Sequence, residues 1–216
     1  MSERGRRQAR AIGPLVVDLV PAVAVVSDLA RTRQAADLIG LDGATPSAAW
    51  READLGEWTG RSKADLLATC PDLYRRRRDG RYDPPGADGW ETFKARVAGT
   101  LAALPDTPGT TVVVTHGGVI RAACALLVCL DPDRMVPVDP GSATAFDLAD
   151  TARLEAFNVT GSASSMAASF GSFGRNWSAT SSDRADRWRA SPEAPWNGDK
   201  PEPISRPPYA KIGLSN

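Results

Sequence analysis

The 216-residue sequence predicts an α/β fold built on a mostly parallel sheet that is covered on both faces. Short apolar runs rich in β-branched residues are typical of buried strands, and they alternate with periodic or wholly apolar segments typical of helices. This alternation continues to residue 160 and then gives way to Gly, Ser, Pro and Arg. We therefore expect one domain over residues 1–160 and a mostly disordered tail over residues 161–216.

The domain is expected to begin with a helix, a strand and a second helix. Ser2 can cap the first helix, which runs through Leu15. Residues 22–26 are a short apolar run suited to a buried parallel strand. A second helix over residues 29–39 ends at Gly40, because glycine readily adopts the left-handed conformation that closes a helix.

The middle of the domain is expected to be mainly helical. Two short helices over residues 62–68 and 72–78, separated by Pro71, follow a loop-rich stretch. Asp88 is expected to cap a longer helix, with Glu91 placed as the carboxylate of a capping box. The apolar residues of that helix recur every three or four positions, which predicts one buried face.

The last part of the domain predicts a buried strand, a buried helix and two closing strands. Residues 111–115, with the sequence TVVVT, are β-branched throughout. Residues 118–130 are apolar nearly all round, which is typical of a helix inside the protein. The closing strands are expected over residues 143–148 and 154–159.

Composition excludes several classes of protein. Lys plus Arg and Asp plus Glu each number 26, so the whole chain lacks the net charge that would hold nucleic acid or an anionic membrane. The Arg-rich start and the apolar run after it imitate an export signal, but Asp18 and Pro21 interrupt the run and no segment reaches membrane-spanning length. Three cysteines without metal-site spacing favour a reducing compartment over a disulfide framework or a zinc site. We therefore predict a cytoplasmic protein.

The predicted tail interleaves aromatic residues with arginines, as at Arg175 and Trp177 or Arg187 and Trp188. Such a pattern can bind single-stranded nucleic acid. Acidic residues such as Asp186 dilute the positive charge, so we favour a tail that folds back or binds weakly to another molecule.

The single histidine, His116, is the strongest candidate for chemistry. It ends the TVVVT strand and is followed by Gly117, Gly118 and a predicted helix. In open α/β sheets, ligands bind outside the carboxyl ends of the strands, and the free N–H groups of a helix that starts there suit an anion. The two glycines let the backbone approach a ligand closely. This segment therefore predicts an imidazole beside an anion-binding turn.

Arginines near the strand ends are candidates for binding the same anion. Arg31 follows the strand over residues 22–26, where its guanidinium can bind phosphate oxygens in pairs. Arg33 is the alternative, although it has more of the character of a solvated helix residue. The run from Arg75 to Arg78 is the densest positive patch, typical of a solvated face but able to steer phosphorylated substrates.

Glu52 is the candidate proton donor. It lies in the segment WREADLGEWTG, where a carboxyl group in a Trp-lined, partly dry pocket could protonate a leaving group. Asp54 and Glu57 compete for this role, and spacing alone leaves the choice open.

Taken together, these segments resemble the histidine phosphatase superfamily, also called the phosphoglycerate mutase-like family. The matching pieces cover about residues 2–149, and the most specific are READLGEWTG and THGGVIRA in that order. The other pieces are SERGRRQARAIGPL, VVSDLARTRQAADLI, PPGADGWETFKARV and GSATAFDL. The resemblance implies a doubly wound α/β sheet with a small helical cap.

The resemblance also implies phosphoryl transfer through a phosphohistidine, with no metal or other cofactor. Arg31, His116 and Gly117 would bind the phosphate of a small phosphorylated substrate or inorganic phosphate, His116 as the second histidine of the family's site. Glu52 would protonate the leaving oxygen. Hydrolysis of phosphomonoesters is the expected activity, and mutase-type transfer is an alternative.

One departure from the family concerns its nucleophile, a histidine in an Arg-His-Gly motif at the end of a first, central strand. The sequence has one histidine and no such motif. We therefore expect the first, central strand to be missing and the chain to turn over little substrate. Either the true start lies upstream, or the chain is a degenerate relative. A non-catalytic module that binds a phosphorylated ligand or a protein is a further alternative.

Overall fold

A six-stranded sheet organises the molecule, in the strand order β2-β1-β3-β6-β4-β5. The computed structural model describes residues 1–105, 107–148, 151–160 and 210–215. The strands are β1 Val23–Ser27, β2 Thr45–Ser47, β3 Thr111–Thr115, β4 Ala143–Asp147, β5 Arg153–Val159 and β6 Ala210–Ser215. The helices are α1 Glu3–Asp18, α2 Ala30–Ile39, α3 Lys63–Thr69, α4 Pro71–Arg78, α5 Trp90–Ala102 and α6 Gly117–Val128, with short 3₁₀ turns at Ala48–Trp50, Gly56–Trp58 and Pro132–Arg134.

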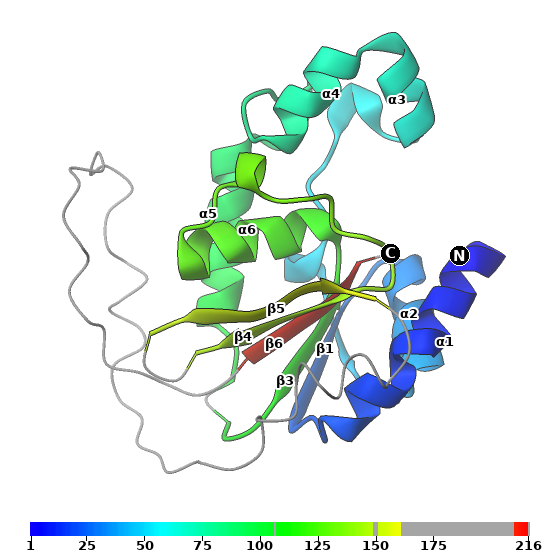
Figure 1. Ribbon diagram of the computed structural model, residues 1–216, viewed down its shortest axis with the longest axis vertical. Helices are drawn as coiled ribbons and strands as arrows, with labels where there is room; N and C mark the ends of the chain where they lie inside the picture. Colours follow the sequence, from blue (N-terminus) through cyan, green and yellow to red (C-terminus); the bar gives the residue numbers. More distant parts are fainter. Residues whose placement is uncertain (106, 149–150, 161–209, 216) are drawn as a thin grey trace.

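The sheet is mostly parallel and separates two layers of helices, as predicted. Strands β1, β2, β3 and β6 run parallel, whereas β4 pairs antiparallel with β5 and β6. Helices α1 and α2 cover one face, and α5 and α6 cover the other (Figure 1). Successive residues of β3 serve the two faces, because Val112 and Val114 belong to the core under α1 and α2 while Val113 belongs to the core under α5 and α6.

Local signals fix the ends of the first two helices. The Ser2 side chain accepts a hydrogen bond from the N–H of Gly5 at 3.2 Å and so caps α1. Gly40 ends α2 with a φ of 89°, in the left-handed region that costs glycine little. Both predictions are confirmed. Strand β2 was not predicted, because Thr45–Ser47 is a short edge strand that contains Pro46.

Asp88 does not cap α5, which corrects the sequence-based prediction. The helix begins at Trp90 after Gly89, and the Asp88 carboxylate instead accepts a hydrogen bond from the N–H of Asp54 at 3.0 Å. Glu91 pairs with Lys94 one turn further along the helix rather than closing a capping box. The competing partner lies in a loop distant in sequence, so the local pattern could not reveal it.

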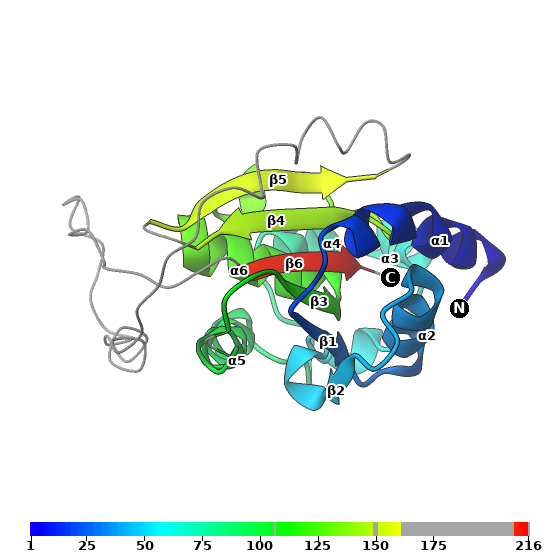
Figure 2. The same ribbon diagram turned by 90° about the horizontal axis from the view of Figure 1, so that it is seen from below.

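The position between β3 and β4 is taken by β6 (Figure 2). Ala210 pairs with Thr111, and the parallel register continues to Ser215 beside Thr115, with one irregularity before the last pair. The sequence-based prediction placed residues 210–215 in the tail, whereas the structure places them in the sheet as β6. A first, central strand was expected to be missing, and β6 lies at the position between β3 and β4. Residues 161–209, which contain the predicted aromatic and arginine pattern, lie outside the described part of the chain.

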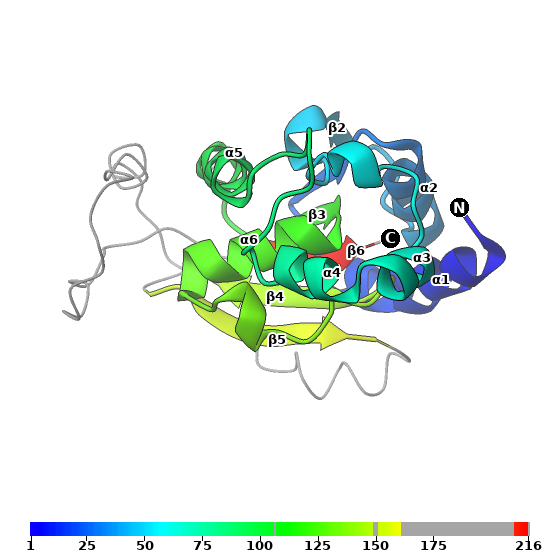
Figure 3. The same ribbon diagram turned by 90° about the horizontal axis from the view of Figure 1, so that it is seen from above.

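Helices α3 and α4 form the small cap that the resemblance implied. They lie beyond the edge of the sheet toward which β1 and β3 point (Figures 1 and 3). Pro71 is the first residue of α4, a position where its missing N–H costs nothing. The parallel register pairs Val26 with Val114, so β1 and β3 end at the same edge, below the cap.

Candidate active site

The ends of β1 and β3 bring together two buried polar side chains, Ser27 and His116. His116 directly follows β3, Ser27 is the last residue of β1, and their exposed fractions are 1% and 0%. The His116 Nε2 atom lies 2.9 Å from the Ser27 Oγ atom. A buried imidazole needs such partners, because an unpaired polar group away from water is costly. The pair fixes the ring at the edge of the sheet.

Arg31 reaches the other nitrogen of the ring. It lies in the first turn of α2, and its Nη2 atom is 3.1 Å from His116 Nδ1. The neighbouring Thr32 hydroxyl donates to the carbonyl oxygens of Ser27 and Leu29, at 2.8 and 2.7 Å, which ties this turn to the end of β1. The strand end and the helix start therefore place guanidinium and imidazole in direct contact.

These contacts determine the state of His116. A guanidinium can only donate, so Nδ1 must carry the lone pair and Nε2 the proton, which it donates to Ser27. Burial lowers the pKa of His116 to about 4. The negative charge of Glu52 acts in the opposite direction and raises this pKa, whereas the positive charges of Arg31 and Arg96 lower it further by smaller amounts. The ring is therefore neutral near pH 7, with both nitrogens engaged.

The Glu52 side chain contacts the N-terminus of α6, the helix that follows His116. Its Oε2 atom accepts a hydrogen bond from the N–H of Gly118 at 2.9 Å, and its Oε1 atom accepts one from the N–H of Ala53 at 3.0 Å. A Cβ atom on Gly118 would lie 2.0 Å from Oε1. Only glycine at this position therefore leaves room for the carboxylate, which also benefits from the positive end of the helix dipole.

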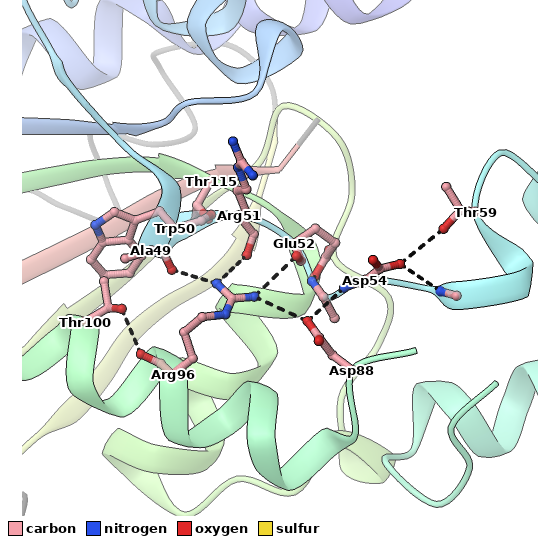
Figure 4. A network of polar contacts seen from close by, with 12 residues as sticks. Ala49, Trp50, Arg51, Glu52, Asp54, Thr59, Asp88, Arg96, Thr100 and Thr115 are labelled. Carbon is pink, nitrogen blue, oxygen red and sulfur yellow. Dashed lines mark hydrogen bonds and ion pairs between the residues drawn. The ribbon is translucent and has the colours of Figure 1, made fainter. Parts of the chain in front are cut away.

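The segment that carries Glu52 is tied to both strand ends. The buried Thr115 hydroxyl donates to the carbonyl oxygen of Trp50 at 2.8 Å. Arg51 donates to both oxygens of Asp28, at 2.7 and 2.6 Å, and this hydrogen bonding lowers the pKa of Asp28. Trp50 is only 2% exposed, but its side chain points away from that of Glu52 (Figure 4), so a Trp-lined pocket around Glu52 stays a prediction.

The two carboxylates that competed with Glu52 lie elsewhere. Asp54 is exposed and closes a turn by accepting hydrogen bonds from the N–H of Gly56 at 2.8 Å and from the Thr59 hydroxyl at 3.3 Å (Figure 4). Glu57 is exposed in the following turn. Of the three carboxylates, only Glu52 contacts the helix that begins after His116.

The remaining candidates divide between the site and the surface. Gly117 is half-buried and opens α6 directly after His116. Arg33 is exposed on α2. On α4, Arg75 pairs with the exposed Asp72, while Arg78 donates to the carbonyl oxygen of Met135 at 3.1 Å.

Two residues that contact the site were missed from the sequence. Ser27 ends a parallel strand, so the rule that selected His116 could have selected it as well. Arg96 lies inside an amphipathic helix, and no local pattern distinguishes it from a solvated arginine. Its contacts with the Glu52 segment depend on how α5 packs.

The geometry defines a class of protein: an α/β domain with a guanidinium, a buried imidazole and a helix N-terminus meeting at the strand ends, an arrangement suited to a phosphate group. Consistent with this, the model of the histidine phosphatase superfamily (branch 1) matches residues 1–160. The chain belongs to this superfamily.

Relatives of known activity are phosphatases. A glucosyl-3-phosphoglycerate phosphatase of Mycobacterium tuberculosis is 31% identical over an alignment of 144 positions that covers 60% of this chain and 65% of the relative, so the match spans just under two thirds of the relative's length. A mycobacterial glucosyl-3-phosphoglycerate phosphatase solved with inorganic phosphate superimposes with a TM-score of 0.60 at 28% identity, covering 74% of this chain and 87% of that one. The same enzyme solved with vanadate gives a TM-score of 0.61 at 28% identity, covering 73% and 86%.

Two further observations concern other kinds of site. Among the residues that the structure describes, no three His, Cys, Asp or Glu side chains are grouped as metal ligands. None of the helices in that part of the chain has both the length and the apolar character needed to span a bilayer.

Proposed function

We propose that the chain binds the phosphate group of a phosphomonoester between Arg31 and His116 and serves phosphatase chemistry, with Glu52 as the proton donor to the leaving oxygen. The contact between Arg31 and His116 at the start of α6 is the observation that carries this proposal. The relatives support it, because they are named as phosphatases and two of their structures hold inorganic phosphate or vanadate.

We further propose that the 216 residues alone turn over little substrate. The sequence contains one histidine, and both of its nitrogens are engaged, one by Arg31 and one by Ser27. An imidazole can attack phosphorus only through a free lone pair. His116 is therefore not placed to attack phosphorus, and it can hold a phosphate oxygen only by donating its Nε2 proton to that oxygen in place of Ser27.

Binding and turnover test these statements separately. Calorimetric titration with inorganic phosphate and with vanadate should show binding that Arg31→Ala and His116→Ala weaken. Hydrolysis of an aryl phosphate by the purified chain should stay near background. No binding by the wild-type chain would refute the proposed site, and robust hydrolysis that is lost in His116→Ala would refute the role given to His116.

A non-catalytic phosphate-binding protein is the second candidate, favoured by the same engagement of His116. Added imidazole distinguishes the two candidates. In a phosphatase site that lacks only its nucleophile, an imidazole nitrogen would form a bond to phosphorus, the bond to the leaving oxygen would break, and Glu52 would protonate that oxygen. Water would then hydrolyse the phosphoimidazole. Stimulated hydrolysis that requires Arg31 and Glu52 favours the phosphatase, and no stimulation favours the binding protein.

A further inference from the structure

We propose that Arg96 is a positioning residue that holds Glu52 against the start of α6 by binding the backbone of the segment that carries it. This inference rests on the role proposed for Glu52. Arg96 does not contact His116, and its proposed effect passes through the segment of residues 49–52.

The contacts of Arg96 converge on that segment. Its Nη1 atom donates to the carbonyl oxygens of Ala49 at 2.7 Å and Arg51 at 3.0 Å, and its Nη2 atom donates to that of Glu52 at 3.3 Å (Figure 4). The Asp88 carboxylate lies 3.9 Å from Nη2. One guanidinium thus binds three backbone carbonyls within four consecutive residues, including that of Glu52 itself.

Arg96 is itself held in place. Its guanidinium carbon lies 4.9 Å from the centre of the Phe93 ring, which is 1% exposed. Both residues belong to α5, a helix packed against the sheet through Phe93, Val97 and Leu101. The core therefore fixes the position of Arg96, and the hydrogen bonds of Arg96 in turn fix the segment of residues 49–52.

The planar fork of arginine suits this task. Its five N–H groups point in fixed directions, whereas a lysine ammonium is a compact charge that cannot reach three separated carbonyls at once. At the other end of Glu52, the carboxylate lies directly against the backbone of Gly118, in the space that a Cβ atom would fill. A small movement of the loop would therefore break the hydrogen bond from Gly118 to Glu52.

The Gly118 amide reports this hydrogen bond directly. An amide that donates to a carboxylate shows a proton resonance that shifts as the carboxylate is protonated. We expect the wild-type Gly118 resonance, compared in a His116→Gln background so that the nearby histidine does not contribute, to have such a pH-dependent step and Glu52→Gln to remove it. Arg96→Lys should also lose the step, although its charge is kept and Glu52 is intact. In the Glu52→Gln background, Arg96→Lys should leave the Gly118 resonance unchanged.

Matched controls keep the test decisive. Arg75→Lys, a change in an exposed ion pair on α4, should retain the step. Arg96→Gln, which removes the guanidinium but leaves Phe93 and the packing of α5 in place, should weaken the step and provides a second variant if Arg96→Lys fails to fold. Phosphate binding by Arg96→Lys should match that of wild type, since Arg31 and His116 are untouched. A Gly118 step in Arg96→Lys equal to the wild-type step would overturn the proposal, even if phosphate binding failed in both proteins.

Discussion

Two regions of the molecule concentrate arginine, and they use it differently. At the strand ends, Arg31 contacts a buried imidazole and Arg96 binds three backbone carbonyls. On α4, four consecutive arginines are exposed or half-buried, and Arg75 pairs with Asp72, whose side chain is 87% exposed. Exposure does not separate the two groups, because Arg31 is itself exposed and the Arg77 side chain on α4 is only 11% exposed; the groups differ in what each guanidinium contacts.

The largest expected difference between the two regions is in the pH dependence of stability. His116 has a pKa of about 4 in the folded chain and near its ordinary value of 6.5 when unfolded. Between these values the unfolded state binds one more proton, so stability falls as the pH falls from 6.5 to 4, by about 3 kcal/mol. Urea unfolding of wild type and His116→Gln should differ by this amount over that range.

Carboxylates also titrate in this pH range, so the comparison with His116→Gln isolates the histidine. An identical fall in both proteins would show that His116 is protonated as readily in the folded state as in the unfolded one. That result would break the proposed contrast between the buried imidazole at the strand ends and the arginines of α4.

The next largest effect is expected for phosphate affinity. Arg31→Ala removes a charged hydrogen-bond donor at the site, which should weaken phosphate binding about 10- to 100-fold. Titration calorimetry at fixed ionic strength measures this directly. A loss below about threefold would place the bound phosphate elsewhere, with α4 the first alternative to test.

A smaller effect on stability is expected for Gly118→Ala. The new Cβ atom displaces the Glu52 carboxylate and leaves the buried N–H of residue 118 without its acceptor, so the free energy of unfolding should fall by about 1–2 kcal/mol. Because the carboxylate must move, imidazole-stimulated hydrolysis should also fall while phosphate affinity is kept. Denaturation and kinetics of the same preparation check both statements. Unchanged stimulated hydrolysis would contradict the role of this close approach.

The smallest effect is expected on α4. Arg75→Ala breaks an exposed ion pair, so the free energy of unfolding should change by less than about 0.5 kcal/mol. Phosphate affinity should stay within about twofold of the wild-type value. A larger loss of affinity would show that the arginine run attracts the ligand, and would reverse the comparison.

The elements built on strong local patterns could be predicted from the sequence. The β-branched run gives β3, the apolar run gives β1, and Ser2 and Gly40 mark helix ends. Interactions between distant segments could not be predicted. Asp88 has a good capping position by spacing, but the N–H of Asp54 competes for its carboxylate, and only the folded chain brings the two together.

The residues of the candidate site also fall into those that the sequence could predict and those that it could not. His116 could be selected from the sequence, because it stands at a strand end and is followed by two glycines. Ser27 and Arg96 act through neighbours 89 and 44–47 residues away in the sequence. Strand β6 alternates apolar residues at 210, 212 and 214 with Lys, Gly and Ser, a pattern that could have indicated a strand, but its place beside β3 depends on pairing with a distant segment.

The most direct test of the central claim is nitrogen and proton NMR of the only histidine, on a chain purified without a histidine tag. We expect a neutral ring at pH 7 with the proton on Nε2, and a change in the Nδ1 resonance when inorganic phosphate is added. That change should be absent in Arg31→Ala. A ring already protonated at pH 7, or resonances that ignore saturating phosphate, would contradict the account.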